Sequence, residues 1–253
     1  IYTQYNKQLL KVLKMISLHI FKINGLKEQH LDYIKHYTSV NEKEEEFDVE
    51  LKQYISEYNI REKYLIDFKF THESVTKIQI DERNFPNFHV DSAEIWISFK
   101  HPQTFIFIKS SSNLDFILSE LKRIIQINIP LEQMVELKTN ELDLKEYFAD
   151  IIKKDASEVL SGWWKGLNAN DHSVNLHGIL RDDEGIESEL YSLINETAKT
   201  KTSVRIMSKK LVNTITISQN KLYSPHKEVN SITLIEYFDK IIYPLFKYPQ
   251  EQE

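Results

Sequence analysis

Apolar residues recur at helical spacing over residues 7–23, where Leu, Val and Ile line one side and lysines line the other. This pattern predicts an amphipathic helix. Further helices are expected over residues 26–37 and 43–58, so residues 1–60 are predicted to be an N-terminal helical segment. A basic amphipathic helix can lie on a membrane surface or bind a partner, but packing on the domain through its apolar side is the simpler interpretation.

Alternation of β-branched and aromatic residues then predicts strands and a hairpin. The four strands are expected at residues 65–70, 75–80, 94–99 and 104–109, with residues 100–103 as the loop between the last two. A helix is expected after Asn113, a good helix-capping residue, with apolar positions running from Leu114 to Ile125. Residues 61–140 are therefore predicted to be an α/β half that contains a hairpin and a helix.

The rest of the chain alternates again between helical and strand patterns. We expect helices at residues 142–160 and 186–197 and after Asn230, and strands at residues 174–180, 203–207 and 212–218. Residues 141–185 are predicted to be a helix followed by a connection rich in Trp and Gly. Residues 186–253 are predicted to form a second α/β half.

Together these elements indicate an α+β protein, with two mixed α/β halves preceded by N-terminal helices. The halves can also be aligned as a degenerate helix–strands–helix repeat, in which residues 50–57, 75–80 and 113–125 correspond to residues 189–196, 212–217 and 230–242. Generic amphipathic elements align easily, so a duplication and two unrelated segments with similar packing both remain open.

Charge is distributed unevenly along the chain, although the protein as a whole is acidic, with a formal net charge of -6. Residues 197–227 contain no acidic residue but seven lysines and arginines. Lys199, Lys201 and Arg205 occupy alternate positions, so on a strand they are expected to form one cationic face. Such a row could bind the phosphates of a nucleic acid. The alternative is an edge strand whose lysines prevent pairing with another sheet.

The most unusual composition lies at residues 161–185, which hold four of the five glycines and two of the three tryptophans. Glycine allows close backbone approach, and Trp163 and Trp164 beside Lys165 could form a ligand platform or anchor a partner. The alternative is that these tryptophans fill a junction between two domains.

Catalytic and metal-binding patterns are weak. His172 and His177 are five positions apart, which is not a recognised ligand spacing, so neither a metal nor another cofactor is expected. A metal-dependent hydrolase, such as a nuclease, would need several of the following acids and lysines to converge: Asp67, Lys69, Asp91, Glu94 and Lys109. The chain has no cysteine and no G-x-S-x-G motif, so nucleophilic catalysis has no support.

We therefore expect a non-catalytic binding or regulatory subunit of an intracellular assembly, which contacts nucleic-acid backbone or an acidic protein surface. The residues expected to make these contacts are Lys199, Lys201, Arg205, Lys209 and Lys210, together with Trp163, Trp164 and Lys165. A metal-dependent hydrolase and a structural adaptor assembled through the 7–23 helix are the alternatives. Without cysteine, and without an apolar run long enough to span a membrane, the chain is expected to be cytoplasmic.

Overall fold

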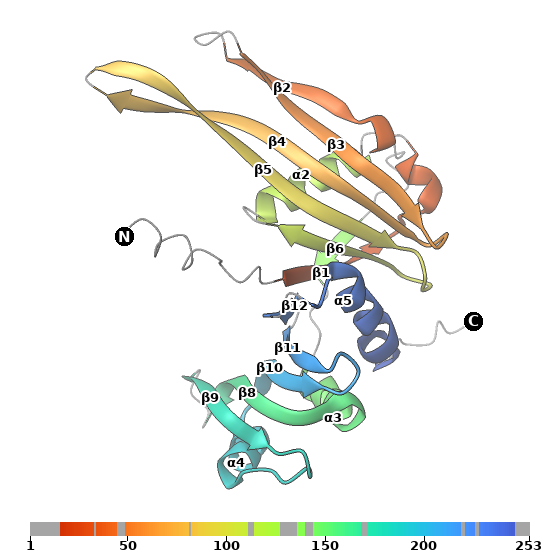
Figure 1. Cartoon of the computed structure of the whole chain (residues 1–253), viewed down its shortest axis with the longest axis vertical. Helices are drawn as coiled ribbons and strands as arrows, with labels where there is room; N and C mark the ends of the chain where they lie inside the picture. The colour runs from red at the N-terminus through yellow and green to blue at the C-terminus, as the bar shows by residue number, and fades with distance from the viewer. Residues whose placement is uncertain are drawn as a thin grey trace, which may run out of the picture. The chain divides into compact units, whose positions relative to one another are not determined.

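The computed structural model shows a protein built mainly of β-strands (Figure 1). It describes residues 16–32, 34–44, 49–80, 82–110, 114–126, 136–139, 144–167, 172–218, 221–225 and 228–245. The strands in these residues are β1 (Ile16–Asn24), β2 (Thr38–Glu44), β3 (Val49–Arg61), β4 (Leu65–Ile80), β5 (Arg83–Ser98), β6 (Thr104–Ser110), β7 (Glu136–Thr139), β8 (Ala156–Leu167), β9 (His172–Arg181), β10 (Thr200–Ser208), β11 (Asn213–Ser218) and β12 (Lys221–Ser224).

The described strands join in one large antiparallel sheet, in the order β2-β3-β4-β5-β6-β1-β12-β11-β10-β8-β9, and β7 also pairs with β1. The α-helices among the described residues are α2 (Leu114–Gln126), α3 (Leu144–Asp155), α4 (Glu189–Thr197) and α5 (Ser231–Tyr237). A π-helical turn, Phe238–Ile242, continues α5, and short 3₁₀ turns occur at Glu28–Leu31, Ile34–His36 and Tyr243–Leu245.

The expected α+β fold with N-terminal helices is therefore wrong. Residues 16–23 of the expected first helix lie in β1, and residues 49–58 of the expected third helix lie in β3. In β3, Leu51, Gln53 and Ile55 are buried at intervals of two, as a strand requires. Over so few residues, apolar positions four apart fit a helix and a strand equally well, so this spacing does not distinguish the two. Residues 7–15 lie outside the described residues.

The later elements agree better with the patterns. The two strands expected at residues 65–70 and 75–80 are one continuous strand, β4, whereas those expected at 94–99 and 104–109 lie in β5 and β6 and the helix expected from Leu114 is confirmed as α2. The proposed repeat fails at its first element, because residues 50–57 lie in strand β3 whereas residues 189–196 lie in helix α4.

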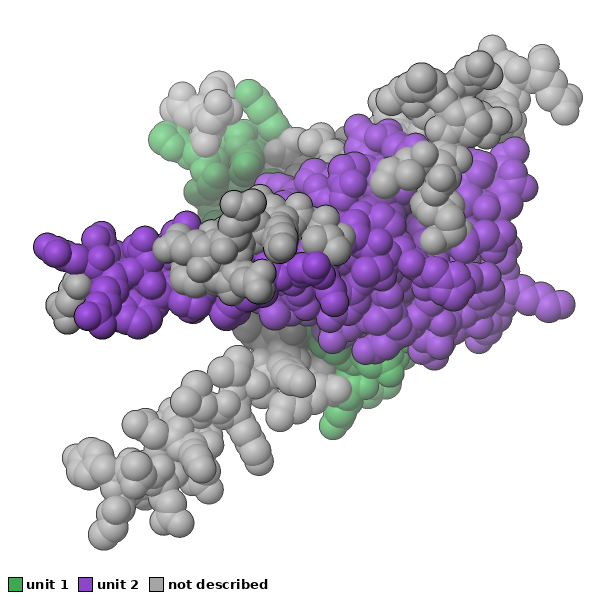
Figure 2. Space-filling model, turned by 90° about the horizontal axis from the view of Figure 1, so that it is seen from above, with its two compact units in different colours: residues 1–19, 140–253 green, residues 20–139 purple. Residues whose placement is uncertain are grey.

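The chain divides into two compact units (Figure 2): unit 1 comprises residues 1–19 and 140–253, and unit 2 comprises residues 20–139. Strand β1 contributes to both, since its first four residues pair with β12 and its last four pair with β7. The four-part division drawn from the sequence remains a prediction.

In unit 2, α2 packs on the sheet through the apolar side that its sequence predicts. Ile117, Leu121 and Ile124 are fully buried, in one cluster with strand residues such as Phe68 and Phe70. Burying one such side chain stabilises the fold by about 1.5–3 kcal/mol, so this cluster is the main source of stability for the helix.

The β4–β5 hairpin continues past this cluster as a two-stranded ribbon, which Figure 1 shows as a long projection. Its register pairs Val75 with Phe88 and Ile78 with Phe85. The large apolar side chains on the ribbon are 45–65% exposed: Ile78, Ile80, Phe85, Phe88 and Val90. We call these five residues the apolar ribbon. Alternation places Ile78, Ile80 and Phe85 on one side of the ribbon and Phe88 and Val90 on the other. Exposed apolar side chains that gather in this way often mark an interaction site.

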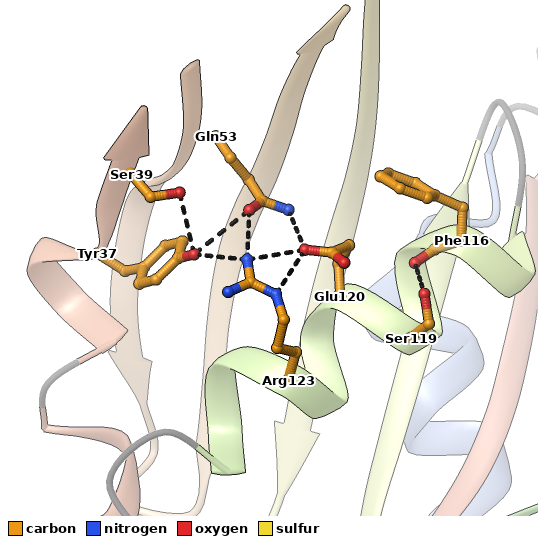
Figure 3. A network of polar contacts seen from close by, with 7 residues as sticks. All are labelled: Tyr37, Ser39, Gln53, Phe116, Ser119, Glu120 and Arg123. Atoms are coloured by element: carbon orange, nitrogen blue, oxygen red, sulfur yellow. Dashed lines mark hydrogen bonds and ion pairs between the residues drawn. The ribbon is translucent and has the colours of Figure 1, made fainter. Parts of the chain in front are cut away.

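A polar network holds α2 against β3 (Figure 3). Gln53 is only 1% exposed, and its Nε2 donates to Glu120 Oε2 at 2.8 Å. Arg123 Nη2 donates to the same Glu120 oxygen at 2.8 Å, to Gln53 Oε1 at 2.8 Å and to the Tyr37 hydroxyl at 3.0 Å. The network therefore supplies partners for a buried amide that would otherwise be costly.

Charge makes this network sensitive to pH. Burial on its own would raise the pKa of Glu120, but hydrogen bonds from Gln53 and Arg123, with the positive charges of Arg123 and His72, hold it below its ordinary value. The network thus stabilises the ionised carboxylate in the folded state.

Glu120→Gln is expected to lower the free energy of unfolding at pH 7 by about 1 kcal/mol, because Arg123 and Gln53 lose a charged acceptor. A depressed folded-state pKa gives stability that is complete above the unfolded-state pKa and is lost as the pH falls through the folded-state pKa. Urea denaturation should therefore show a difference in the free energy of unfolding between wild type and variant at pH 7, and this difference should disappear in strong acid. Glu196→Gln, an exposed change on α4, is the control and should have little effect. A difference in the free energy of unfolding that persists unchanged in acid would contradict the stabilising role of the ionised Glu120 carboxylate.

In unit 1, α3 ends at Asp155 and β8 begins at the next residue, so the helix expected to reach residue 160 stops earlier. The Asp155 side chain is fully buried. It accepts hydrogen bonds from Ser208 Oγ at 2.5 Å, the Lys210 backbone N–H at 2.8 Å and the Tyr237 hydroxyl at 2.7 Å. This carboxylate joins α3, the turn after β10 and α5. Burial, with the charge of Asp155 and its hydrogen bond, raises the pKa of Tyr237, so its hydroxyl stays a donor.

Candidate functional site

A β-bulge in β10 decides which side chains of the predicted cationic strand reach each face. Lys201 pairs with Trp164 and Ser203 pairs with Trp163, so Thr202 is an extra residue without a counterpart on β8. An extra residue reverses the alternation of faces along a strand. Lys201 is consequently buried with Val204 and Ile206, at 4% exposure, whereas Arg205 is exposed. The expected single row of Lys199, Lys201 and Arg205 is not formed.

The face that carries Arg205 also carries Trp163. Residues directly opposite each other in an antiparallel pair project to the same side. One cross-strand row on this face runs through β9, β8, β10, β11 and β12 as Asn175, Trp163, Ser203, Ser218 and Lys221. The neighbouring row runs as His177, Ser161, Arg205, Thr216 and Tyr223.

We call these two rows, with Lys165 next to Trp163 along β8, the Trp163 face. Trp163 is 47% exposed, and Lys165 and Arg205 are exposed on either side of it. The charged residues of these two rows and Lys165 are all cationic, and the other members are small polar residues, two aromatics and one histidine. In the row beyond Arg205, Met207 pairs with Glu158, so an acidic residue borders the face. An exposed tryptophan among cations on a polar sheet surface is suited to bind a ligand that combines negative charge with flat rings.

Trp164, the neighbour of Trp163, lies on the opposite face and is 1% exposed. Its ring covers Gly162, where a Cβ atom would overlap the ring atoms. Gly162 is therefore required for packing rather than for a turn. Only Trp163 of the predicted pair is exposed to a partner, and Trp164 belongs to the core of unit 1.

Lys201 lies among aromatic rings on this buried face. Its Nζ is 5.3 Å from the ring centres of Phe148 and Tyr191 and 5.6 Å from that of Trp164. It also donates to the Tyr191 hydroxyl at 3.5 Å. Cation–π attraction of this kind offsets part of the cost of taking a lysine out of water.

The remaining predicted cations lie around the ends of β10. Lys199 is exposed between α4 and β10. Lys209 and Lys210 are exposed in the turn after β10, and their backbone N–H groups bind the carbonyl oxygen and Oδ1 of Asp155 at 2.7 and 2.8 Å. Asp155 thus holds the backbone of a turn that presents two lysines, apart from the rows that contain Trp163.

The residues of the hydrolase alternative lie on both faces of the β4–β5 pair. Lys69 pairs with Glu94, and alternation places Asp67 and Lys109 on their side, whereas Asp91 pairs with His72 on the other. Asp67 forms an ion pair with Arg61, and Glu94 forms one with Lys109 at 2.6 Å. Within the described residues no group of three or more His, Asp or Glu side chains could hold a metal ion. The hydrolase alternative gains no supporting observation.

Of the two histidines considered as metal ligands, His177 has another partner in the described structure. His177 Nε2 is hydrogen-bonded to Asn175 at 2.7 Å on the Trp163 face. Asp182 Oδ1 accepts the Ile186 N–H at 2.8 Å and so stabilises the loop before α4.

Comparison with protein-family models and with curated proteins gave no match. Among the described residues, no helix is long and apolar enough to cross a membrane.

Replacing Gly162 with alanine is expected to destabilise the protein by about 1–3 kcal/mol, since the new methyl group must displace the Trp164 ring. The measurement is the midpoint and slope of urea unfolding. Combining Gly162→Ala with Trp164→Leu removes the ring that clashes, so the two changes together should cost less than the sum of the single changes. Additive costs would show that the ring and the glycine do not interact.

Proposed function

We propose that this protein is a non-catalytic binding protein whose Trp163 face contacts a nucleic acid, with Trp163 stacking on a base and Lys165, Arg205 and Lys221 near phosphates. The observation that carries the proposal is the exposed Trp163 in two cross-strand rows whose charged side chains, with that of the adjacent Lys165, are all positive. The nearest acid that the pairing places on this face, Glu158, lies in the row beyond Arg205. Aromatic platforms with cationic surroundings are the common means by which proteins bind single-stranded nucleic acid.

The dimensions of the sheet support this arrangement. Neighbouring strands are about 4.8 Å apart, and alternate residues along a strand are about 6.8 Å apart. Lys165 and Arg205 are therefore near neighbours of Trp163, and Lys221 lies in the same cross-strand row three strands away. His19 pairs with Lys221, and burial and the Lys221 charge lower its pKa, so it stays neutral and leaves the lysine as the charged group there.

Not every residue expected from the sequence enters the proposal. Lys201 and Trp164 are buried on the other face and do not contact the ligand. Lys199, Lys209 and Lys210 are exposed near the ends of β10 and could add long-range attraction for a polyanion. An acidic protein surface is the other ligand that the cations would attract, but it offers nothing for Trp163 to stack on.

Fluorescence titration with a single-stranded oligothymidylate tests the proposal, because Trp96 and Trp164 are buried and Trp163 is 47% exposed. We expect binding to quench the Trp163 emission, and Trp163→Ala to weaken affinity by about 1–3 kcal/mol. Lys165→Ala and Arg205→Ala should each lower the salt dependence of binding by roughly one phosphate contact.

Lys154→Ala is the matched control, since Lys154 is an exposed lysine on α3 of the same unit but belongs to neither row of the Trp163 face. If Lys154→Ala and Lys165→Ala weaken the affinity for oligothymidylate equally, net charge and not the Trp163 face drives binding. Poly-glutamate serves as the second ligand: binding of poly-glutamate but not of oligothymidylate would replace nucleic acid with an acidic protein.

A second candidate function, protein binding, is favoured by the apolar ribbon of unit 2. Self-association is the form of it that the purified chain can test. If the apolar ribbon is the contact between copies, sedimentation velocity should show an apparent molecular mass that rises with protein concentration. The double variant Phe85→Ser with Phe88→Ser should abolish this rise. Ile60→Ser is the control, because Ile60 and Phe88 are both 52% exposed but Ile60 lies outside the ribbon. A wild-type chain that stays monomeric would contradict self-association.

A further inference from the structure

Unit 1 contains a partly open cavity of about 310 Å³ between its helices and its sheet. The elements around it are α3, the end of β9, the loop before α4, α4 itself and the start of β10. The residues that line it are Ala149, Ile152, Lys153, Arg181, Glu187, Tyr191, Asn195 and Lys201. Its volume is at the lower limit of the roughly 300–1,000 Å³ range of ligand pockets, so it suits a compact ligand.

The lining of this cavity is cationic, although the protein as a whole is acidic. Among the described residues that line it, Lys153, Arg181 and Lys201 carry positive side chains and Glu187 carries a carboxylate. The positive side chains come from three separate elements, which only the folded chain brings together. A partly enclosed space concentrates the field of such charges and attracts anions.

Lys201 is the deepest of the three cations, at 4% exposure. The bulge at Thr202 turns it towards the cavity, and Thr202 Oγ1 donates to the Trp163 carbonyl at 3.2 Å, which holds the bulge against β8. Bulges frequently redirect a side chain next to a functional site. A buried cation at the wall of a cavity attracts an anion more strongly than a cation in water does, because the effective dielectric constant is lower.

Neutral donors complete the site. The Tyr191 oxygen accepts from Lys201 Nζ, which leaves its hydroxyl hydrogen to be donated. Burial and the Glu187 charge raise the pKa of Tyr191 to about 12, against a smaller opposite effect of Arg181, so this hydroxyl is protonated at neutral pH. The Asn195 amide on the next turn of α4 also lines the cavity.

We propose that this cavity binds a small organic anion through its phosphate or carboxylate group, with Lys201, Arg181 and Lys153 around the negative charge and Tyr191 as a hydroxyl donor. Arg181 offers a planar pair of N–H donors that matches either group. Glu187 is at the exposed side of the cavity, where its carboxylate favours a ligand with an amine or hydroxyl at the end away from the anionic group. The proposal does not depend on nucleic-acid binding by the Trp163 face.

Thermal unfolding in inorganic phosphate, acetate or sodium chloride at equal ionic strength tests the proposal, because a ligand of the folded state raises the unfolding temperature in proportion to its occupancy. We expect phosphate, acetate or both to stabilise the protein more than chloride does. The probe with the larger effect identifies the group that the cavity prefers. Equal midpoints in all three salts would overturn the proposal.

Variants at the exposed Lys153 and Glu187 keep the test independent of folding. Lys153→Gln is expected to weaken the apparent affinity for the stabilising anion several-fold, and Arg181→Gln by about tenfold or more, since charged hydrogen bonds are lost. Glu187→Gln is expected to strengthen it several-fold, because a repelling carboxylate is removed. Lys201→Met should abolish binding if the variant folds.

Two controls separate this site from general charge effects and from the other proposal. Lys154→Gln removes a neighbouring α3 lysine that is not part of the lining, so it should leave anion affinity unchanged. Lys165→Ala with Arg205→Ala should also leave it unchanged while altering oligothymidylate binding. If Lys154→Gln weakens the affinity as much as Lys153→Gln, or if Glu187→Gln does not strengthen it, the proposal is wrong.

Discussion

The arrangement of unit 1 depends on one extra residue, Thr202, in β10. Side chains alternate along a strand, so one inserted residue exchanges the faces of everything beyond it. With the bulge, Val204 and Ile206 meet the helices while Arg205 faces outward, and Lys201 joins the apolar side. Without it, Lys201 would lie next to Trp163 or the apolar residues would face water. Both proposed surfaces therefore rest on the same local departure from regular pairing.

Patterns in the sequence predicted much of the fold after residue 60 and little before it. The strand content of β4 to β6, the helix α2 and the later helices α3, α4 and α5 follow from periodicity, whereas β8, which covers residues expected as helix and connection, does not. Spacing predicts helices over residues 16–23 and 49–58 because leucine and isoleucine four apart satisfy both periods. What decided in favour of strands was pairing with other strands: β1 pairs with β12 and β7, which are remote in sequence, and β3 pairs with β4, which follows it. Single-sequence spacing carries no information about such partners.

The candidate site was predicted in part. Trp163, Lys165 and Arg205 were singled out from composition and charge, and the structure places them together on one face. Placing Lys201 with them failed because nothing in the residue types marks Thr202 as a bulge. Other residues of the cavity, such as Arg181 and Tyr191, were missed because they come from separate elements and occupy ordinary positions there. Only tertiary packing makes them neighbours.

Two buried charged groups in unit 1 illustrate different physical situations. Asp155 is fully buried, but three hydrogen bonds satisfy its carboxylate and connect three elements, so its burial is explained by structure alone. Lys201 has three aromatic rings and the Tyr191 hydroxyl among its contacts, and it also lies in the wall of a cationic cavity. Taking its charge out of water costs stability. In the proposed site, the charge that carries this cost is also the charge that attracts the ligand.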